Sequence, residues 1–243
     1  MMSETRDAET EKHLHDIRTE SVEDFLKAVY DLERQITPVP TTLLAQALNI
    51  TAASVTDMLK RLSSTTGIPP LLDYTRYKGV TLTPLGKQIA LEVIRHHRLL
   101  ELYLSEALGY SWDEVHKEAD KLEHHISEQL ESRIAQALGN PVIDPHGDPI
   151  PALDGTLPDT DWSLLSELKV GQRAEISRIT DQSPEVLRYF SDLGLTPGMT
   201  ITLTERAPLE DTVSLTIGSD HAKNKTISSQ IARKVLVTAT KSK

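Results

Sequence analysis

The chain has 243 residues, enough for one large domain or two to three small ones. It contains no cysteine, which excludes disulfides, thiolate zinc sites and iron–sulfur clusters, so any metal must be held by His, carboxylate, amide or Met side chains. The formal net charge of −10 argues against a uniformly basic nucleic-acid-binding protein. No apolar run reaches about 18 residues and the start is not signal-like, which predicts a cytoplasmic protein without membrane contact.

The charge is unevenly distributed along the chain. Between Thr41 and Arg98 there are seven Lys and Arg residues against three Asp and Glu residues. Most of the acidic residues therefore lie elsewhere. The sequence predicts a local basic surface on an acidic body, which is a common arrangement in DNA-binding proteins of low overall charge.

The first part of the chain predicts a tail followed by three helices. Residues 1–18 are polar and lack periodicity, as expected of a mobile tail. The apolar spacing from Thr19 to Arg34 predicts an amphipathic helix that carries Asp24 near its start. The stretches TTLLAQALNI and AASVTDMLKRLSST predict two short helices joined by a tight turn, with Thr51 as N-cap of the second. This pattern is typical of a helix-turn-helix, with an ordinary helical hairpin as the alternative.

The following residues favour the helix-turn-helix. Two β-like runs, 71–74 and 79–82, flank the basic turn 75–78, and a helix-turn-helix followed by a basic hairpin is a winged helix. Residues 19–90 are therefore predicted to form a winged-helix DNA-binding domain. Lys60, Arg76 and Lys78 are expected to contact phosphates, whereas the outward residues at the start of the recognition helix suit thymine methyl groups and DNA shape. The candidate DNA contacts are Thr51, Ala53, Ser54, Thr56, Asp57, Lys60, Arg76 and Lys78.

Residues 91–140 are predicted to be helical and hold most of the unusual chemistry. Thr83-Pro84 provides a helix start, and the helix runs through IRHHRLLELYLSEAL to a break at 109–111. A second helix is expected over DEVHKEADKLEHHISEQLESRI, residues 113–134. His97 and Glu101 are four residues apart and share one face of the first helix. Four further side chains fall on one stripe of the second helix, namely His116, Asp120, Glu123 and His124.

Two antiparallel helices would bring these three carboxylates and three imidazoles close together. Clustered carboxylates repel one another unless a positive charge lies between them, and a divalent metal meets that need. Nitrogen and oxygen ligands together favour Mn, Fe, Co, Ni or Zn over Ca or Mg. A solvated helix face is the alternative, although five of the nine histidines of the chain lie in this stretch.

The C-terminal part predicts a linker and a small β-domain. Residues 141–160 are rich in Pro, Gly and Asp and predict an extended linker. In residues 161–243 the runs RAEISRI, TITLTERA, TVSLTIG and VLVTAT alternate as strands, with one helix, PEVLRYFSDL, among them. Such short strands predict a small barrel of the SH3 type. No catalytic triad, P-loop or Rossmann glycine pattern is found, so we do not expect an enzyme.

From about residue 19 to the end, the chain resembles the diphtheria toxin repressor family of metal-dependent transcription regulators, particularly its manganese-sensing branch. The pieces that carry the resemblance are EDFLKAVYDLE, the pair HHRLLE and VHKEADKLEHH, and HGDPIPALD, in matching order and separation. The last domain looks like the ferrous-transport accessory module of longer members. The resemblance implies an α+β fold with an N-terminal winged helix-turn-helix, a helical dimerisation domain and a C-terminal SH3-like barrel. It also implies a homodimer that is activated by Mn²⁺ or Fe²⁺ and binds double-stranded operator DNA as a repressor.

The resemblance also implies a ligand set. The family's primary metal site falls on Asp24, Asp120, Glu123 and His124. A second site falls on His97, Glu101 and His116, completed by a group from the barrel for which Asp181 and Glu185 are the candidates. Iron-sensing members have Met and Cys where this chain has the hard carboxylates Asp24 and Asp120. Some manganese sensors have a Glu where this chain has Lys27, so a closely spaced two-metal cluster is not expected.

The implied mechanism is that metal ties the DNA-reading part, through Asp24, to the dimer body. Two recognition helices would then be held about one helical turn, roughly 34 Å, apart on a palindromic operator. The metal increases the population of this DNA-competent arrangement only to the extent that it binds this arrangement more tightly than the others. Two other classes remain as alternatives, a carboxylate-bridged helical metalloenzyme and a metal-binding scaffold without a DNA role.

Overall fold

The computed structural model describes residues 12–207, 209–218 and 223–240. The chain divides into two compact units, residues up to 96 together with 151–156, and residues 97–150 together with 157 onward. Residues 12–17, which the sequence places in a mobile tail, are helical, and residues 1–11 lie outside the described part. Helices and antiparallel strands occupy both units, so the predicted α+β class is confirmed.

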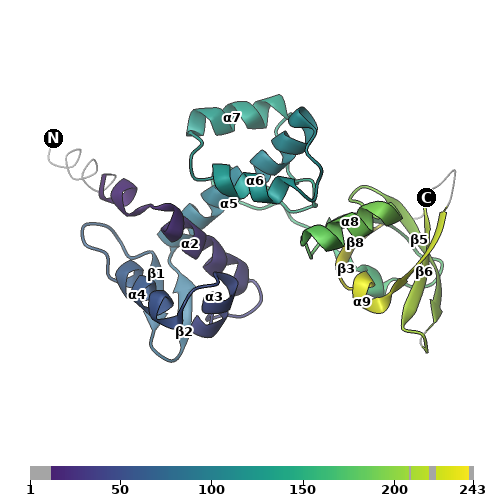
Figure 1. Ribbon diagram of the computed structural model, residues 1–243, viewed down its shortest axis with the longest axis horizontal. Helices are drawn as coiled ribbons and strands as arrows, with labels where there is room; N and C mark the ends of the chain where they lie inside the picture. Colours follow the sequence, from purple (N-terminus) through teal and green to yellow (C-terminus); the bar gives the residue numbers. More distant parts are fainter. Residues whose placement is uncertain (1–11, 208, 219–222, 241–243) are drawn as a thin grey trace. The chain divides into compact units, whose positions relative to one another are not determined.

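The first unit is a winged helix (Figure 1). Its elements are α2 (Glu20–Glu33), α3 (Thr41–Ala47), α4 (Ala52–Ser63), β1 (Leu72–Thr75) and β2 (Gly79–Leu82). The predicted cap is present, because the Thr51 hydroxyl accepts a hydrogen bond from the Ser54 amide at 3.1 Å. The apolar stripe of α4 is buried through Val55, Leu59 and Leu62, which leaves the opposite face of that helix open to solvent.

The two strands of the wing pair antiparallel from Leu72 opposite Leu82 to Thr75 opposite Gly79. A backbone bridge between Val39 and Val80 fastens the second strand to the chain that precedes α3. The base of the wing is therefore held by the domain, and its turn at residues 76–78 projects from it.

Helix α5 (Pro84–Leu108) starts and ends where the sequence predicts. The Thr83 hydroxyl accepts from the Gly86 amide at 3.1 Å, and Gly109 follows the helix with a φ of 72°. The second predicted helix is wrong as a single element, since it is split into α6 (Val115–Leu122) and α7 (Glu128–Ala137). Ser127 causes the break, because it has an extended backbone and its side chain caps α7 by accepting from the Leu130 amide.

The segment after α7 differs from the expected linker. Asp144, His146, Asp148 and Ile150 are buried, so this half of residues 141–160 packs into the second unit. The Asp144 carboxylate accepts from the amides of His146 at 2.8 Å and Asp148 at 2.9 Å, which closes a tight turn. A stretch rich in Pro, Gly and Asp is typical of a solvent-exposed linker. Here its polar groups form hydrogen bonds with one another, and they can therefore be buried.

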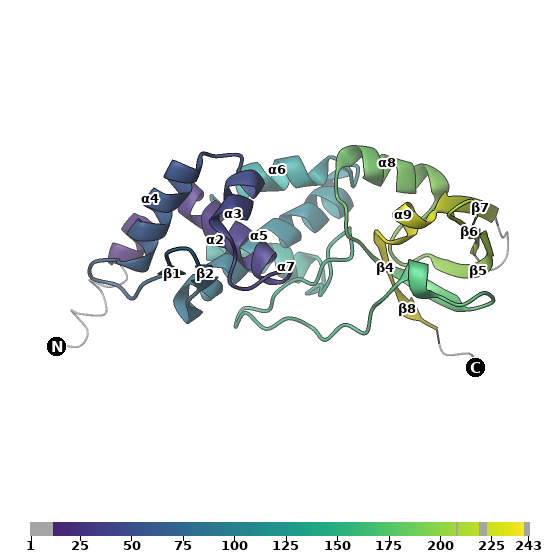
Figure 2. The same ribbon diagram turned by 90° about the horizontal axis from the view of Figure 1, so that it is seen from below.

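The C-terminal β-domain is one six-stranded antiparallel sheet in the order β3-β8-β4-β5-β6-β7, with the small helices α8 and α9 packed against it (Figure 2). Its strands are β3 (Ser163–Leu164), β4 (Arg173–Ile179), β5 (Thr200–Ala207), β6 (Thr212–Ile217), β7 (Lys223–Ser228) and β8 (Val235–Ala239). The helices are α8 (Pro184–Leu193), α9 (Ser229–Ala232) and a 3₁₀ turn, η1 (Leu165–Glu167).

Four of the six strands and α8 follow the predicted runs, and the predicted SH3-like domain is confirmed. Strands β3 and β7 were not predicted: β3 has two residues, and β7 (KNKTIS) lacks apolar alternation. A bulge between Ile176 and Arg178 interrupts the pairing of β4 with β8. Such bulges redirect the side chains beside them, and this one lies next to the segment of residues 144–150.

Candidate metal centre

Three ligand-type side chains of the second unit meet at one point between α5 and α6. His97 and Glu101 lie one turn apart on α5, and His116 lies on α6. The Nε2 atom of His97 is 2.9 Å from Oε1 of Glu101 and 2.9 Å from Nδ1 of His116. The third side of the triangle, from His116 Nδ1 to the same Glu101 oxygen, measures 3.0 Å. Glu101 and His97 are buried, whereas His116 is partly open to solvent.

This triangle fits a cation better than it fits hydrogen bonds alone. A carboxylate oxygen only accepts, and two imidazole nitrogens in contact can share one proton, so the three contacts cannot all be good hydrogen bonds. Ligand atoms at about 2.1 Å from an octahedral ion are separated by about 3.0 Å, whereas a tetrahedral ion separates them by about 3.4 Å. The observed sides match one face of an octahedron, and the donor set of two imidazoles and a carboxylate suits a divalent transition metal.

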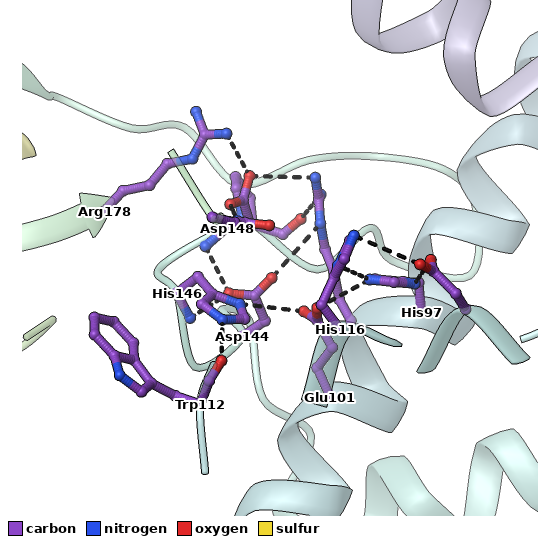
Figure 3. Close-up of polar contacts among 12 residues, drawn as sticks. His97, Glu101, Trp112, His116, Asp144, His146, Asp148 and Arg178 are labelled. Atoms are coloured by element: carbon purple, nitrogen blue, oxygen red, sulfur yellow. Dashed lines mark hydrogen bonds and ion pairs between the residues drawn. The ribbon is translucent and has the colours of Figure 1, made fainter. Parts of the chain in front are cut away.

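The other oxygen of Glu101 faces a second group of ligand-type residues (Figure 3). Its Oε2 lies 3.4 Å from Nδ1 of His146, and ligand atoms of Glu101, Asp144 and His146 all lie within 4.8 Å of one another. His146 is stacked on Trp112, and its Nε2 lies 2.7 Å from the Trp112 carbonyl oxygen. That nitrogen therefore carries the proton, and the buried Nδ1, for which the described residues provide no hydrogen bond, faces the Glu101 carboxylate. Such a pair requires either a second proton or a cation.

The proton is favoured in the metal-free protein. Burial lowers the pKa of His146, but the carboxylates of Glu101 and Asp144 outweigh it and raise that pKa to about 9. Burial, together with Glu101 and Asp148, raises the pKa of Asp144 to about 7 against the opposing charges of His146 and Arg98. Burial also acts to raise the pKa of Glu101, but the three imidazoles around it bring it well below its ordinary value. The centre thus holds positive charge in the form of protons that a divalent cation can replace.

The remaining predicted ligands of the second unit lie on the other side of His97. Its Nδ1 contacts Glu123 and lies 3.4 Å from Asp120, whose second oxygen is 3.6 Å from Nε2 of His116. His124 Nε2 is 3.4 Å from Glu123. The structure therefore gathers Asp120, Glu123 and His124 beside His97. Asp24 is exposed on α2 in the first unit, so its place in the expected primary site stays a prediction.

The two barrel candidates are not brought to this centre. Asp181 lies 2.6 Å from the Lys234 ammonium and accepts from Ser183, and Glu185 is exposed on α8. Within the described part of the chain, neither residue belongs to a group of His, Asp and Glu close enough to share one ion. The ion pair with Lys234 accounts for the position of the Asp181 carboxylate.

The β-domain reaches the centre through different residues. Arg178 and Gln182 each contact the buried Asp148 at 2.7 Å, and Arg98 of α5 contacts the same carboxylate at 3.3 Å. The sequence reasoning missed Asp144 and His146 as potential ligands. The signal was available, because HGDPIPALD begins with His146, but a histidine in an apparent linker gave no reason to expect burial.

The candidate DNA contacts lie on the winged helix, at the face that α4 and the wing leave open. Thr51, which caps α4, is exposed, and Thr56, which donates to the Ala52 carbonyl oxygen at 2.8 Å, is half-buried. The other candidates are exposed on α4 and at the wing, namely Ala53, Ser54, Asp57, Lys60, Arg76 and Lys78.

Three domain families match the chain in the order of the expected domains. Residues 18–80 match the N-terminal DNA binding domain of the iron dependent repressors, and residues 83–152 match their metal binding and dimerisation domain. Residues 164–239 match the FeoA domain. The chain belongs to the iron-dependent repressor family. Like the family, it is a metal-dependent DNA-binding transcriptional repressor and not an enzyme.

Other iron-dependent repressors are similar over most of their length. The iron-dependent repressor IdeR of Mycobacterium leprae is 28% identical over 231 residues, which cover 90% of this chain and 96% of the relative. The diphtheria toxin repressor of Corynebacterium diphtheriae is 27% identical over 202 residues, or 77% and 85% of the two chains.

Among solved structures, a manganese-dependent transcriptional repressor in complex with manganese is 34% identical, with a TM-score of 0.80 over 90% of this chain and 100% of the other. The IdeR of T. acidophilum is 28% identical, with a TM-score of 0.70 over 92% and 100%. Of the helices in the described part of the chain, none combines the length and hydropathy needed to cross a bilayer.

Proposed function

We propose that this repressor is a cytoplasmic homodimer that binds a palindromic operator when Mn²⁺ occupies the centre around Glu101, with Fe²⁺ as the alternative ion. The observation that carries the proposal is the triangle of His97 Nε2, Glu101 Oε1 and His116 Nδ1, whose sides of 2.9, 2.9 and 3.0 Å suit an octahedral ion. The matches to a DNA-binding domain and to a dimerisation domain support the operator DNA and the homodimer in this proposal.

The preference for manganese rests on ligand chemistry. Intrinsic affinity rises from Mn²⁺ through Fe²⁺ and Co²⁺ to Ni²⁺, so a manganese sensor depends on ligand type and geometry. Asp120, Glu123 and Glu101 are hard oxygen donors, and the chain has no cysteine that would favour softer ions. A similar repressor of known structure binds manganese, which supports the same choice here.

The residues of the centre link metal occupancy to the orientation of the helices. His97, Glu101 and His116 would hold a divalent cation, which would neutralise the carboxylates and compete with protons for the imidazole nitrogens. The three side chains would then hold α5 against α6. Because α5 runs from residues next to the wing into the metal-binding domain, the two are connected by one helix. Asp24 would add a ligand from the DNA-binding domain, as the sequence predicts.

The test is a metal series in DNA binding. Duplexes recovered by the wild-type protein from fragmented genomic DNA with saturating MnCl₂ are labelled and titrated by fluorescence anisotropy. The series contains MnCl₂, anaerobic FeCl₂, CoCl₂, NiCl₂ and ZnCl₂, with an EDTA-treated sample as reference.

We expect at least a tenfold tighter affinity with Mn²⁺ than with EDTA, which corresponds to about 1.4 kcal/mol of coupling. The variant His116→Ala should lose most of this difference, whereas Lys169→Ala, an exposed change in the β-domain, should keep it. Equal affinity with and without metal would contradict the proposal and favour a metal-binding scaffold or a helical metalloenzyme.

A further inference from the structure

The side chain of Arg18 connects two helices of the first unit. Its Nε lies 2.8 Å from Oε1 of Glu23 on α2, and a terminal nitrogen of the same guanidinium lies 2.7 Å from Oε1 of Glu92 on α5. Arg18 belongs to neither helix, because it follows a short helix of residues 12–17 and precedes the start of α2 (Figure 1). One guanidinium therefore bridges the two helices from outside both of them.

This bridge is partly shielded from water. The side chains of Arg18, Glu23 and Glu92 are 24%, 10% and 30% exposed. Ion pairs at an open surface contribute little, because water and side-chain entropy offset the attraction. A planar guanidinium that binds two shielded carboxylates loses less to both effects. Without it, Glu23 would remain buried without the cation that it shares with Glu92.

The segment that carries Arg18 is itself held by the first unit. The Arg18 amide donates to the Leu14 carbonyl oxygen at 3.1 Å, which closes the short helix. The imidazole of His13 packs beside Gly67 in the loop after α4, since a Cβ added to Gly67 would lie 3.3 Å from its Nδ1. Residues 12–18, which we call the amino-terminal segment, are therefore placed to keep the guanidinium between its two carboxylates.

The first turn of α2 lacks a side-chain cap. Thr19 is the N-cap residue, but in the described part of the chain its side chain makes no capping hydrogen bond. A capping side chain normally holds the first turn of a helix. Here Arg18 binds Glu23 within that turn. Asp24 is the next residue, so the turn that Arg18 holds also sets the position of Asp24.

The two ends of the bridge lie beside residues of the metal response. Asp24 is the ligand expected from the DNA-binding domain, and His97 follows Glu92 along α5. We infer that Arg18 is a positioning residue for this response, because its two ion pairs hold α2 on α5 before any cation binds. A protein with a larger binding-competent fraction responds at a lower metal concentration. The inference rests on the proposed function and adds a residue that sets the metal concentration at which the repressor responds.

The test follows DNA binding while the concentration of Mn²⁺ is varied. A duplex recovered by the wild-type protein with saturating MnCl₂ is labelled, and fluorescence anisotropy gives two quantities for each variant. The first is the MnCl₂ concentration at half-maximal binding, and the second is the DNA affinity at saturating MnCl₂. For Arg18→Ala we expect the half-maximal concentration to rise by about fivefold, the lower end of the usual coupling between sites.

The DNA affinity of Arg18→Ala at saturating MnCl₂ should stay within about twofold of the wild type, because excess metal restores the competent arrangement. Lys12→Ala provides the matched control, since it removes an exposed positive charge from the same segment. It should leave both quantities as they are in the wild type.

A second variant tests the bridge from its other end. Glu92→Gln keeps the shape of the side chain without its negative charge, and it should also raise the half-maximal MnCl₂ concentration. The double variant of Arg18→Ala and Glu92→Gln should show a smaller rise than the product of the two single effects, because both changes remove the same contact. Single effects that multiply fully would mean that the two residues act separately, which overturns the inference.

Two other results would overturn it as well. The first is an unchanged half-maximal MnCl₂ concentration in Arg18→Ala. The second is clearly weaker DNA binding of Arg18→Ala at saturating MnCl₂, since the bridge would then support the fold or the DNA contact; a lower Tm would identify the fold. If the wild type binds its duplex equally with and without Mn²⁺, the proposed function fails and the inference fails with it. A metal-dependent wild type with an unaffected Arg18→Ala variant removes the inference alone.

Discussion

Glu101 and His146 face each other in the buried part of the metal centre, with Oε2 of the carboxylate 3.4 Å from Nδ1 of the imidazole. The opposite oxygen of Glu101 contacts His97 and His116, so one carboxylate joins this pair of imidazoles to His146. His146 belongs to the segment that also contacts the β-domain. A change of charge at Glu101 therefore alters the electrostatic interactions of both of its oxygens.

The charge of His146 predicts a pH dependence of the metal-free protein. Its pKa of about 9 lies above the value of about 6.5 for an unfolded histidine. The stabilisation is therefore complete below the unfolded value and is lost as the pH rises through about 9. We expect the free energy of unfolding of EDTA-treated protein, measured by urea titration, to fall by on the order of 1–3 kcal/mol between about pH 6.5 and about pH 9.

The variant His146→Asn provides the comparison for that measurement, because it keeps a polar side chain that does not titrate. Its stability should depend less on pH over the same interval. Saturating MnCl₂ should reverse the trend in the wild type, since the metal competes with protons for the same atoms. An equally steep fall in His146→Asn would assign the effect to another group.

The contacts of His97 predict an asymmetry between two histidine variants. His97 contacts Glu101 and His116 on one side and Glu123 on the other, whereas Nε2 of His124 lies 3.4 Å from Glu123. In calorimetric titrations with MnCl₂, His97→Ala should weaken both metal-binding events, and His124→Ala should weaken one. The exposed His125 gives the matched control, and His125→Ala should bind as the wild type does. Equal loss of all binding in both variants would indicate a single shared site.

The ion pairs of Asp148 predict that this residue stabilises the packing of the β-domain against the helices of the second unit. Its carboxylate is buried and contacts the guanidinium groups of Arg98 and Arg178, so Asp148→Ala would leave two cations without their shared partner. We expect a loss of about 3 kcal/mol in the free energy of unfolding, the scale for breaking a buried ion pair. Asp159→Ala, an exposed change nearby in the sequence, should alter stability by less than about 0.5 kcal/mol. If Asp148→Ala lowered the free energy of unfolding by less than about 0.5 kcal/mol as well, water would be taking the place of the carboxylate.

The exposed ammonium of Lys78 on the wing predicts how DNA affinity depends on salt concentration. Lys78→Ala should weaken binding to all duplexes alike and lower the slope of log affinity against log salt concentration by about 0.9, the value for one phosphate contact. Fluorescence anisotropy at NaCl concentrations from roughly 50 to roughly 200 mM provides the test. Lys169→Ala, in the β-domain, should leave the slope unchanged. A changed sequence preference at constant slope would show that Lys78 does not contact phosphate.

The sequence by itself determined the elements of this protein wherever a local pattern encodes them. The cap at Thr51 and the apolar period after it specify α4, and the alternation in RAEISRI specifies β4. His97 and Glu101 could be paired because a spacing of four places side chains on one helix face. Family resemblance extended this to DNA binding and metal dependence.

Only the tertiary structure decided how the centre is completed. His146 and Asp144 reach Glu101 because a turn of self-bonded polar groups is buried between the helices and the β-domain. Asp181 is held instead by Lys234, a partner far away in the sequence. Periodicity describes one element at a time, whereas these contacts depend on where a loop packs and on which charges it meets there, and such long-range pairings leave no regular spacing in the chain.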